Sequence, residues 1–267
     1  MRVECSGTSD VGLVRSHNED DFFVGQQIIA VADGMGGQAA GEVASHVVVD
    51  MLRECDSGER LHKSDIIKLL ADVNTKLLCY GDENPEARGL GSTVAGLATV
   101  FIGDVEHWLV FNIGDSRVYR HHDGALQRLT TDHNEVQSLL AAGLVSEDEA
   151  RTHPSRTVLT RSLGSRVPPR ADTMLVPKLA GDAFVLCSDG LSSEVGDDEI
   201  AAIVGECPAA PAEVAQRLVH AALAAGGADN VTVVAVWVGD AEQSDLLAGI
   251  YEDTQPRPVE GETRVEE

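Results

Sequence analysis

Short runs of apolar, largely β-branched residues recur along the 267-residue chain, and many of them end at a Gly or an Asp. Apolar runs bounded by turn-forming residues are typical of β-strands that are buried in a sheet. We therefore predict strands at residues 27–32, 93–102, 108–113, 116–121, 183–187 and 231–238.

Between these runs, apolar residues recur at the three- and four-residue spacing of an amphipathic helix. This pattern predicts helices at residues 41–54, 64–80, 134–142 and 211–225, with Ser64 as the N-cap of the second helix. Strands, two helices, more strands and further helices do not alternate as in a doubly wound parallel fold. The order predicts an α+β fold, or a layered sandwich, with mainly antiparallel sheets.

Two segments depart from this pattern. Residues 143–170 are polar and contain prolines, so we expect a mobile excursion outside the core that forms a flap near a site. Beyond Asp240, acidic residues outnumber basic ones and apolar residues are few. The chain is therefore predicted to form one domain, residues 1–240, followed by an acidic, flexible tail at residues 241–267.

The charge and the cysteines narrow the possible functions. Asp and Glu number 44 against 20 Lys and Arg, and the formal net charge of −24 repels nucleic acids and anionic membrane surfaces. Five widely spaced cysteines without a CxxC pair argue against a disulfide framework or a zinc site. With no apolar signal region and no run of about 18 apolar residues, a cytoplasmic location is expected.

Asp33, Asp115, Asp189 and Asp229 each stand at an end of a predicted strand, next to or near glycines. One Asp-Gly pair is usually a tight turn, but four such sites are better explained by a shared carboxylate cluster. Oxygen ligands without nearby His or Cys favour Mg²⁺ or Mn²⁺ over zinc. Two such ions about 3.5–4 Å apart can hold a reactive water and clamp a phosphoryl oxygen. The pattern predicts hydrolytic chemistry.

Arg15 lies close in sequence to the acidic residues Glu19 and Asp20. These charges can be read as a surface ion pair, worth about 1 kcal/mol or less. Alternatively, a guanidinium beside a metal cluster can grip a phosphate through paired N–H donors, which a lysine does less specifically. We adopt the second interpretation, in which Arg15 anchors a phosphorylated substrate.

Together these segments resemble the metal-dependent serine/threonine protein phosphatases of type 2C (PPM family), particularly the compact bacterial ones. The resemblance covers about residues 7–238. It is carried, in order, by VRSHNED, ADGMGGQAAGEVAS, GSTVAG, NIGDSRVYR, LTTDHN, RTHPSRTVLTRSLG, CSDGL and GADNVTVV. Each motif alone is weak, whereas eight in the same order are specific.

The resemblance implies a four-layer α/β/β/α sandwich with two packed, mainly antiparallel sheets and a binuclear Mn²⁺ or Mg²⁺ centre at one edge. By the same comparison, Asp33 bridges both ions, the carbonyl of Gly34 ligates one, and Asp189 and Asp229 hold the other. Glu19 and Asp20 resemble the acidic pair that orders metal-bound water. Asp115 resembles a ligand of a weaker third metal.

The implied reaction is hydrolysis of phosphoserine and phosphothreonine on proteins by a metal-bridged hydroxide, with Arg15 binding the phosphoryl oxygens. Two positions depart from the family pattern. Met35 replaces a His that many relatives carry after the DG pair, which leaves a metal-bound water or His153 as proton donor, although a His before Pro is more often structural. Ser193 replaces an Asp, which weakens the case for tight binding of the third metal.

The implied partners are phosphorylated proteins, including an opposing bacterial Ser/Thr protein kinase, and the protein is expected to be a monomer. A phosphatase dedicated to one phosphoprotein, such as an anti-sigma-factor antagonist, is the alternative within the same enzyme class. A pseudophosphatase that binds phosphoproteins without turnover is the alternative from another class. The presence of Arg15, Asp33, Asp189 and Asp229 disfavours it.

Overall fold

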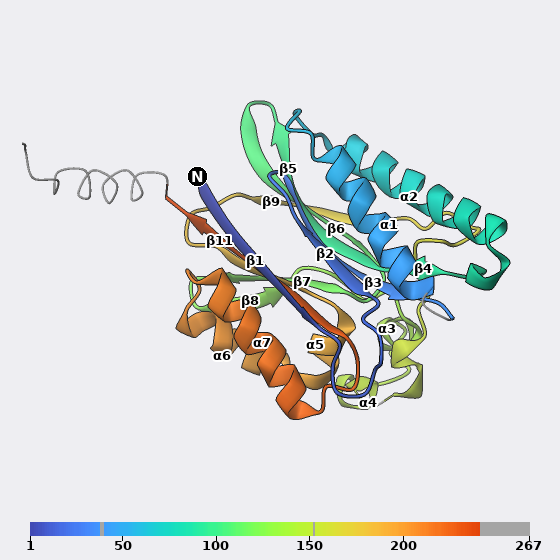
Figure 1. Cartoon of the computed structure of the whole chain (residues 1–267). Helices are drawn as coiled ribbons and strands as arrows, with labels where there is room; N and C mark the ends of the chain where they lie inside the picture. The colour runs from blue at the N-terminus through green and yellow to red at the C-terminus, as the bar shows by residue number, and fades with distance from the viewer. Residues whose placement is uncertain (38–39, 152, 241–267) are drawn as a thin grey trace, which may run out of the picture.

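The computed structural model describes residues 1–37, 40–151 and 153–240. Two β-sheets pack face to face, and a layer of helices covers the outer face of each sheet (Figure 1). The predicted α+β fold with four α/β/β/α layers is therefore confirmed. The predicted tail, residues 241–267, lies outside the described residues.

All strand pairs in the two sheets are antiparallel, as predicted. The five-stranded sheet has the order β1 (Arg2–Asp10), β11 (Val231–Gly239), β10 (Ala183–Cys187), β7 (Arg117–His122) and β8 (Ala125–Arg128). The six-stranded sheet has the order β2 (Asp20–Val24), β3 (Ile28–Met35), β5 (Val94–Ile102), β6 (Val105–Ile113) and β9 (Asp172–Pro177), with β4 (Gly91–Ser92) paired to β3.

The helices form two separate groups with a connecting segment between them (Figure 1). The six-stranded sheet is covered by α1 (Ala40–Cys55) and α2 (Lys63–Glu83), and the short helix η1 (Pro85–Ala87) follows α2. The five-stranded sheet is covered by α5 (Asp189–Glu194), α6 (Asp197–Glu206) and α7 (Pro211–Ala225). The connecting segment contains α3 (Glu135–Ala141), α4 (Glu147–Arg151) and η2 (Pro154–Thr157).

Three hydrophobic cores lie between the four layers. In β3, Ile28 and Ala30 pack with the α1 and α2 side chains, whereas Ile29 and Val31 pack against the other sheet. A strand that is buried on both faces has a continuous run of apolar residues in its sequence, which is why β3 could be predicted from its hydrophobicity. Between the two sheets, Trp108 from β6 contacts Phe184 from β10 in an edge-to-face arrangement with ring centroids 6.0 Å apart.

The six predicted strands and four predicted helices are all present, with bounds shifted by a few residues at most. The prediction missed the strands β1, β2, β4, β8 and β9, the helices α4, α5 and α6, and the short helices η1 and η2. The predicted N-cap Ser64 is wrong, since α2 begins at Lys63 and His62 stands at its N-cap position. The backbone N–H of His62 donates to Asp65 Oδ2 at 2.8 Å, so this end of the helix is closed by the Asp65 carboxylate.

The prediction that residues 143–170 lie outside the core is partly wrong. Leu163 is fully buried, and its backbone exchanges two hydrogen bonds with Ser92, of 2.9 and 3.2 Å. The buried side chain of Asn74 on α2 holds the next turn: Oδ1 accepts from the N–H groups of Gly164 and Ser165, and Nδ2 donates to the Ser165 carbonyl. One apolar side chain and one amide therefore attach this segment to the core.

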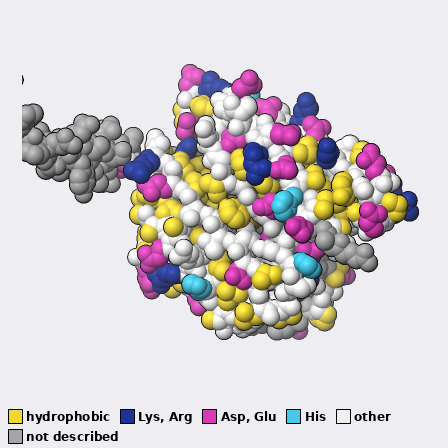
Figure 2. All heavy atoms as spheres, viewed as in Figure 1, with side chains coloured by type: hydrophobic (Ala, Val, Ile, Leu, Met, Phe, Trp, Pro, Cys, Tyr) yellow, Lys and Arg dark blue, Asp and Glu magenta, His cyan; other side chains and the backbone are white. Residues whose placement is uncertain are grey.

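None of the helices in the described ranges is both long and apolar enough to cross a membrane. On the face shown in Figure 2, Lys and Arg side chains are scattered among acidic ones and form no continuous basic patch.

The buried amide of Asn74 provides a stability prediction. We expect Asn74→Ala to lower the free energy of unfolding by about 1–3 kcal/mol, because two N–H groups and one carbonyl lose their buried partner. Urea denaturation measures this change, with Lys76→Ala on the exposed side of α2 as the control that should lie close to wild type. Equal midpoints for the two variants would contradict the proposed attachment.

Candidate functional site

Five aspartates from separate segments meet at one edge of the sandwich. Asp20 and Asp33 are paired across β2 and β3. Asp115 lies in the turn between β6 and β7, Asp189 is the first residue of α5, and Asp229 lies two residues before β11. Asp33 is close enough to the other four that each raises its pKa. The structure thus brings together the four strand-end aspartates predicted from the sequence, with Asp20 as a fifth.

The protonation of these carboxyls is strongly perturbed. Burial, followed by the charges of the neighbouring carboxylates, raises the pKa of Asp33 well above its usual range. Burial is also the main cause that raises the pKa of Asp20 and of Asp115 to about 7, and that of Asp189 to about 6. Like charges in a poorly solvated site cannot all ionise without a compensating cation. The cluster is therefore suited to bind positive charge.

Asp20 joins the two sheets through a hydrogen-bonded chain. The Ser188 hydroxyl donates to Asp20 Oδ2 at 2.7 Å and accepts from the Thr232 backbone N–H at 3.0 Å. Ser188 follows β10 in one sheet, whereas Asp20 begins β2 in the other. This contact fixes the distance between the sheets at the edge where the aspartates lie.

Arg15 forms an ion pair with one of the five aspartates. Its Nη2 donates to Asp229 Oδ2 at 2.8 Å, in an ion pair whose side chains are 51% and 36% exposed. The loop that carries Arg15 is held by Asn230, whose Nδ2 donates to the carbonyls of Val11 and His17, both at 2.9 Å. The guanidinium is therefore positioned at the mouth of the carboxylate cluster.

The backbone of Asp33 is fixed by Ser92, the last residue of β4, and by Thr93, which follows it. Asp33 N–H donates to Thr93 Oγ1 at 3.1 Å, and Thr93 N–H donates back to the Asp33 carbonyl at 2.8 Å. The Ser92 hydroxyl also donates to the Asp33 carbonyl, at 3.1 Å. These contacts give a structural reason for the GSTVAG segment, since they hold the central aspartate rigidly.

Gly34 and Gly41 create a close approach of oxygen atoms beside Asp33. A Cβ on Gly34 would stand 1.9 Å from the Gly41 carbonyl oxygen, so only glycine fits there. A Cβ on Gly41 would stand 2.4 Å from Glu19 Oε1 and 2.8 Å from the Gly34 carbonyl oxygen. Because Gly41 has no side chain, a space remains that is faced by a carboxylate oxygen of Glu19 and by the carbonyl oxygen of Gly34. Both are among the site residues predicted from the sequence.

The donor set at this edge consists of carboxylate and backbone carbonyl oxygens, which fits hard cations such as Mg²⁺ or Mn²⁺. Within the described residues, no three Asp, Glu, His or Cys side chains converge closely enough to hold one ion by themselves. Mg²⁺ is usually bound by one or two carboxylates and keeps several waters. The arrangement therefore fits ions whose coordination is completed by carbonyl and water oxygens.

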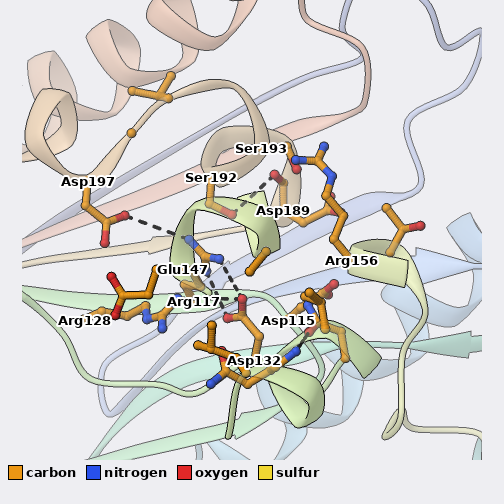
Figure 3. A pocket seen from close by; sticks show the side chains of 18 of the residues that line it. Asp115, Arg117, Arg128, Asp132, Glu147, Arg156, Asp189, Ser192, Ser193 and Asp197 are labelled. Atoms are coloured by element: carbon orange, nitrogen blue, oxygen red, sulfur yellow. Dashed lines mark hydrogen bonds and ion pairs between the residues drawn. The ribbon is translucent and has the colours of Figure 1, made fainter. Parts of the chain in front are cut away.

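The structure also shows the contacts of Met35 and Ser193, which depart from the family pattern, and of His153. The half-buried Met35 side chain lies against Gly91 and offers no proton. His153 accepts from Ser155 N–H through Nδ1 at 3.2 Å and caps η2, which supports its structural interpretation. Ser193 lines a pocket together with Asp115 and Asp189 (Figure 3).

Sequence reasoning missed three residues that organise the site: Thr93, Ser188 and Asn230. Each lies next to or inside a motif already recognised, in GSTVAG, CSDGL and GADNVTVV. Their side chains bind backbone or carboxylate groups from other strands, as described above. Since these partners are far apart in sequence, only the pairing of the strands reveals their role.

Known proteins are similar in sequence to this chain over most of its length. The family model described as Protein phosphatase 2C matches residues 14–225. Serine/threonine protein phosphatase PstP of Mycobacterium tuberculosis (strain ATCC 25618 / H37Rv) is 40% identical over 253 residues, which cover 93% of this chain and 46% of PstP. The chain thus spans about half the length of this relative.

One further relative and one solved structure match over nearly their whole length. Serine/threonine phosphatase stp of Listeria monocytogenes serotype 4b (strain F2365) is 34% identical over 239 residues, covering 85% of this chain and 93% of stp. The crystal structure of the PstP catalytic domain in complex with 2 manganese ions superposes with a TM-score of 0.79 at 36% identity, covering 89% of this chain and 99% of that domain. The fold, the carboxylate cluster at its edge and these matches together show that the chain belongs to the protein phosphatase 2C family.

Proposed function

We propose that this protein hydrolyses phosphoserine and phosphothreonine on other proteins, with two Mn²⁺ or Mg²⁺ ions held at the carboxylate edge. The single observation that carries the proposal is the convergence of Asp20, Asp33, Asp115, Asp189 and Asp229, whose mutual repulsion calls for cations. The manganese ions in the PstP catalytic domain and the names of the relatives support the same conclusion. The family match over residues 14–225 supports residues 1–240 as the catalytic domain.

The proposed ligands divide between the two sheets. Asp33 would contribute to both ions, the Gly34 carbonyl would contribute to one, and Asp189 and Asp229 would hold the other. When bound, the ions supply Lewis-acid polarisation of the phosphoryl group and a water activated for attack on phosphorus. Glu19 faces the space beside Gly41, and Asp20 is fixed by Ser188, so both are placed to orient such water.

Asp115 is proposed as a ligand of a weaker third ion. It is buried and lies in the same pocket as Asp189, with Ser193 nearby. A serine hydroxyl carries no charge, so it attracts a cation less strongly than the aspartate that many relatives have there. We therefore expect the third site to fill only at higher metal concentration than the other two.

Arg15 is proposed to bind the phosphoryl group of the substrate. Its guanidinium is half-exposed at the mouth of the cluster, and its partner Asp229 is itself a proposed metal ligand. If Asp229 held an ion, its charge would be shared with that ion, and the N–H donors of Arg15 would be more available to a phosphate. A Ser/Thr protein kinase is the proposed opposing partner, since such a kinase produces the phosphoproteins that this reaction consumes.

The first prediction concerns metal dependence. We expect purified protein to hydrolyse p-nitrophenyl phosphate and a phosphothreonine peptide with Mn²⁺, and to lose this activity in EDTA. Asp33→Asn should lower kcat by at least about 100-fold, because loss of the bridging carboxylate disrupts the clamp of two metals on the phosphoryl group.

The matched control is Asp72→Asn, which changes an exposed carboxylate on α2 and should retain wild-type rates. Steady-state kinetics at several Mn²⁺ concentrations, with circular dichroism to check folding, measure both variants. Turnover that persists without metal, or a fully active Asp33→Asn variant, would refute the proposed site. Metal and phosphopeptide binding without turnover would instead identify a pseudophosphatase.

A second prediction separates substrate binding from chemistry. Arg15→Ala should raise KM for the phosphothreonine peptide about tenfold with a smaller change in kcat, since the paired N–H donors that grip the phosphate are lost. Arg15→Lys should recover only part of the loss, because an ammonium lacks the fork geometry. Arg2→Ala, which removes an exposed arginine paired with Glu4 on β1, is the control. An unchanged KM in Arg15→Ala contradicts the assignment.

The raised pKa values predict a pH dependence. Asp20 and Asp115 have a folded-state pKa of about 7 and Asp189 of about 6, against an unfolded value of about 3.9. The unfolded chain therefore releases these protons first as pH rises, and the metal-free protein loses their stabilising contribution between about pH 4 and 7. Bound cations, which require ionised carboxylates, restore it.

We expect saturating Mn²⁺ to raise Tm by several degrees more at pH 7.5 than at pH 5.5, as measured by differential scanning fluorimetry. Asp33→Asn should reduce this metal-induced shift at pH 7.5, whereas Asp72→Asn should not. A shift that is equal at the two pH values would show that these carboxyls are already ionised in the metal-free protein.

A further inference from the structure

A cavity of about 590 Å³ adjoins the proposed metal site and extends away from it. Asp115 and Asp189 line one end, which we call the inner end, beside the other site aspartates (Figure 3). Asp197 at the start of α6 and Glu147 at the start of α4 lie at the opposite, outer end, and Asp198 follows Asp197. The cavity is large enough for several side chains of a bound peptide.

Two arginines in the cavity wall are already neutralised. Arg117 donates through Nε and Nη2 to both oxygens of the buried Asp132, at 2.9 and 2.6 Å, and through Nη1 to the Tyr119 hydroxyl at 3.0 Å. Nη1 of Arg128 lies 3.8 Å from the same Asp132 carboxylate. These contacts hold the two guanidiniums against the wall. A third arginine, Arg156, also lines the cavity, but it lies at the inner end, close enough to Asp189 to lower the pKa of that carboxyl (Figure 3).

The outer end, in contrast, presents carboxylates to solvent. The Asp197 side chain is 57% exposed, accepts a hydrogen bond from the Tyr119 hydroxyl at 2.9 Å and forms a long ion pair with Arg117 Nη1 at 3.9 Å, so it is partly neutralised (Figure 3). Glu147 and Asp198 are exposed, and neither carboxylate has a hydrogen-bond or ion-pair partner within the part of the chain that the structure describes. Acidic residues in the first turn of α6 stabilise that helix. Glu147 likewise stands at the start of α4, but the stabilisation of two separate helix ends does not require their carboxylates to line the same cavity.

We propose that this cavity receives the residues that flank the phosphorylated Ser or Thr of the substrate, and that its outer carboxylates select a Lys or Arg side chain. The inference rests on the proposed phosphatase function and specifies its substrate class as phosphoproteins with a basic residue near the phosphorylation site. An ion pair between a substrate cation and a carboxylate at the rim of a binding site contributes mainly to specificity and to the rate of association.

The test compares phosphothreonine peptides that carry one Arg among alanines, placed in turn at each of the three positions before and after the phosphothreonine. We expect wild type to favour at least one Arg peptide over the all-alanine peptide roughly fivefold in kcat/KM at low salt, and less as salt rises. In the Glu147→Gln/Asp198→Asn double variant this ratio should fall close to one, with p-nitrophenyl phosphate hydrolysis unchanged.

Glu199→Gln is the matched control. Glu199 is also exposed in the first turn of α6 but does not line the cavity, so its removal tests for a general effect of net charge. An unchanged preference in the double variant, the same loss in Glu199→Gln, or a preference for Glu over Arg peptides would overturn the inference alone. Failure of wild type to hydrolyse p-nitrophenyl phosphate with Mn²⁺ would overturn the proposed function, and this inference with it.

Discussion

The aspartates at the edge of the sandwich repel one another because they lie close together and are poorly solvated. This repulsion determines how the rest of the site must be built. Burial raises the pKa of Asp20, Asp33, Asp115 and Asp189, and each neighbouring carboxylate adds to the cost of ionisation, which nearby arginines offset only in part. A fold keeps such a cluster only if other interactions hold the side chains in place. Here the strand pairing and the hydrogen bonds of Thr93, Ser188 and Asn230 have that role, and bound cations would remove the remaining penalty.

The same scaffold explains why small residues surround the site. Gly34 and Gly41 allow the start of α1 to pack against β3 so closely that any side chain would collide with a backbone oxygen or with Glu19. Oxygen atoms of the backbone and of a carboxylate then face the same space. The geometry is thus set by the absence of side chains as much as by the presence of charged ones, which explains two of the four glycines in the ADGMGGQAAGEVAS segment, Gly34 and Gly41.

Much of the fold and most of the site followed from the sequence. Strands buried on both faces, such as β3, β10 and β11, are uninterrupted apolar runs, and α7 shows a clear helical period, so both could be predicted. The polar β1 and β9 form sheet edges and leave no such pattern. The burial of Leu163 and the contacts of Asn74 could not be foreseen, because they depend on pairing between segments about 70 to 90 residues apart in sequence. Likewise, the sequence placed Arg15 and Asp229 in one site but gave no sign of their ion pair.

The division of the carboxylates between the two sheets has a mechanical consequence. Asp20 and Asp33 belong to the six-stranded sheet, whereas Asp189 and Asp229 adjoin strands of the five-stranded sheet. An ion shared between the two sets acts as a reversible crosslink across the central core, in the way that a disulfide joins two layers of a secreted protein. Hydrogen bonds already join the sheets at this edge, from Ser188 to Asp20, from the Glu19 backbone to Asn230 and between Thr93 and Ser116, so a shared ion would reinforce a junction that the protein itself builds.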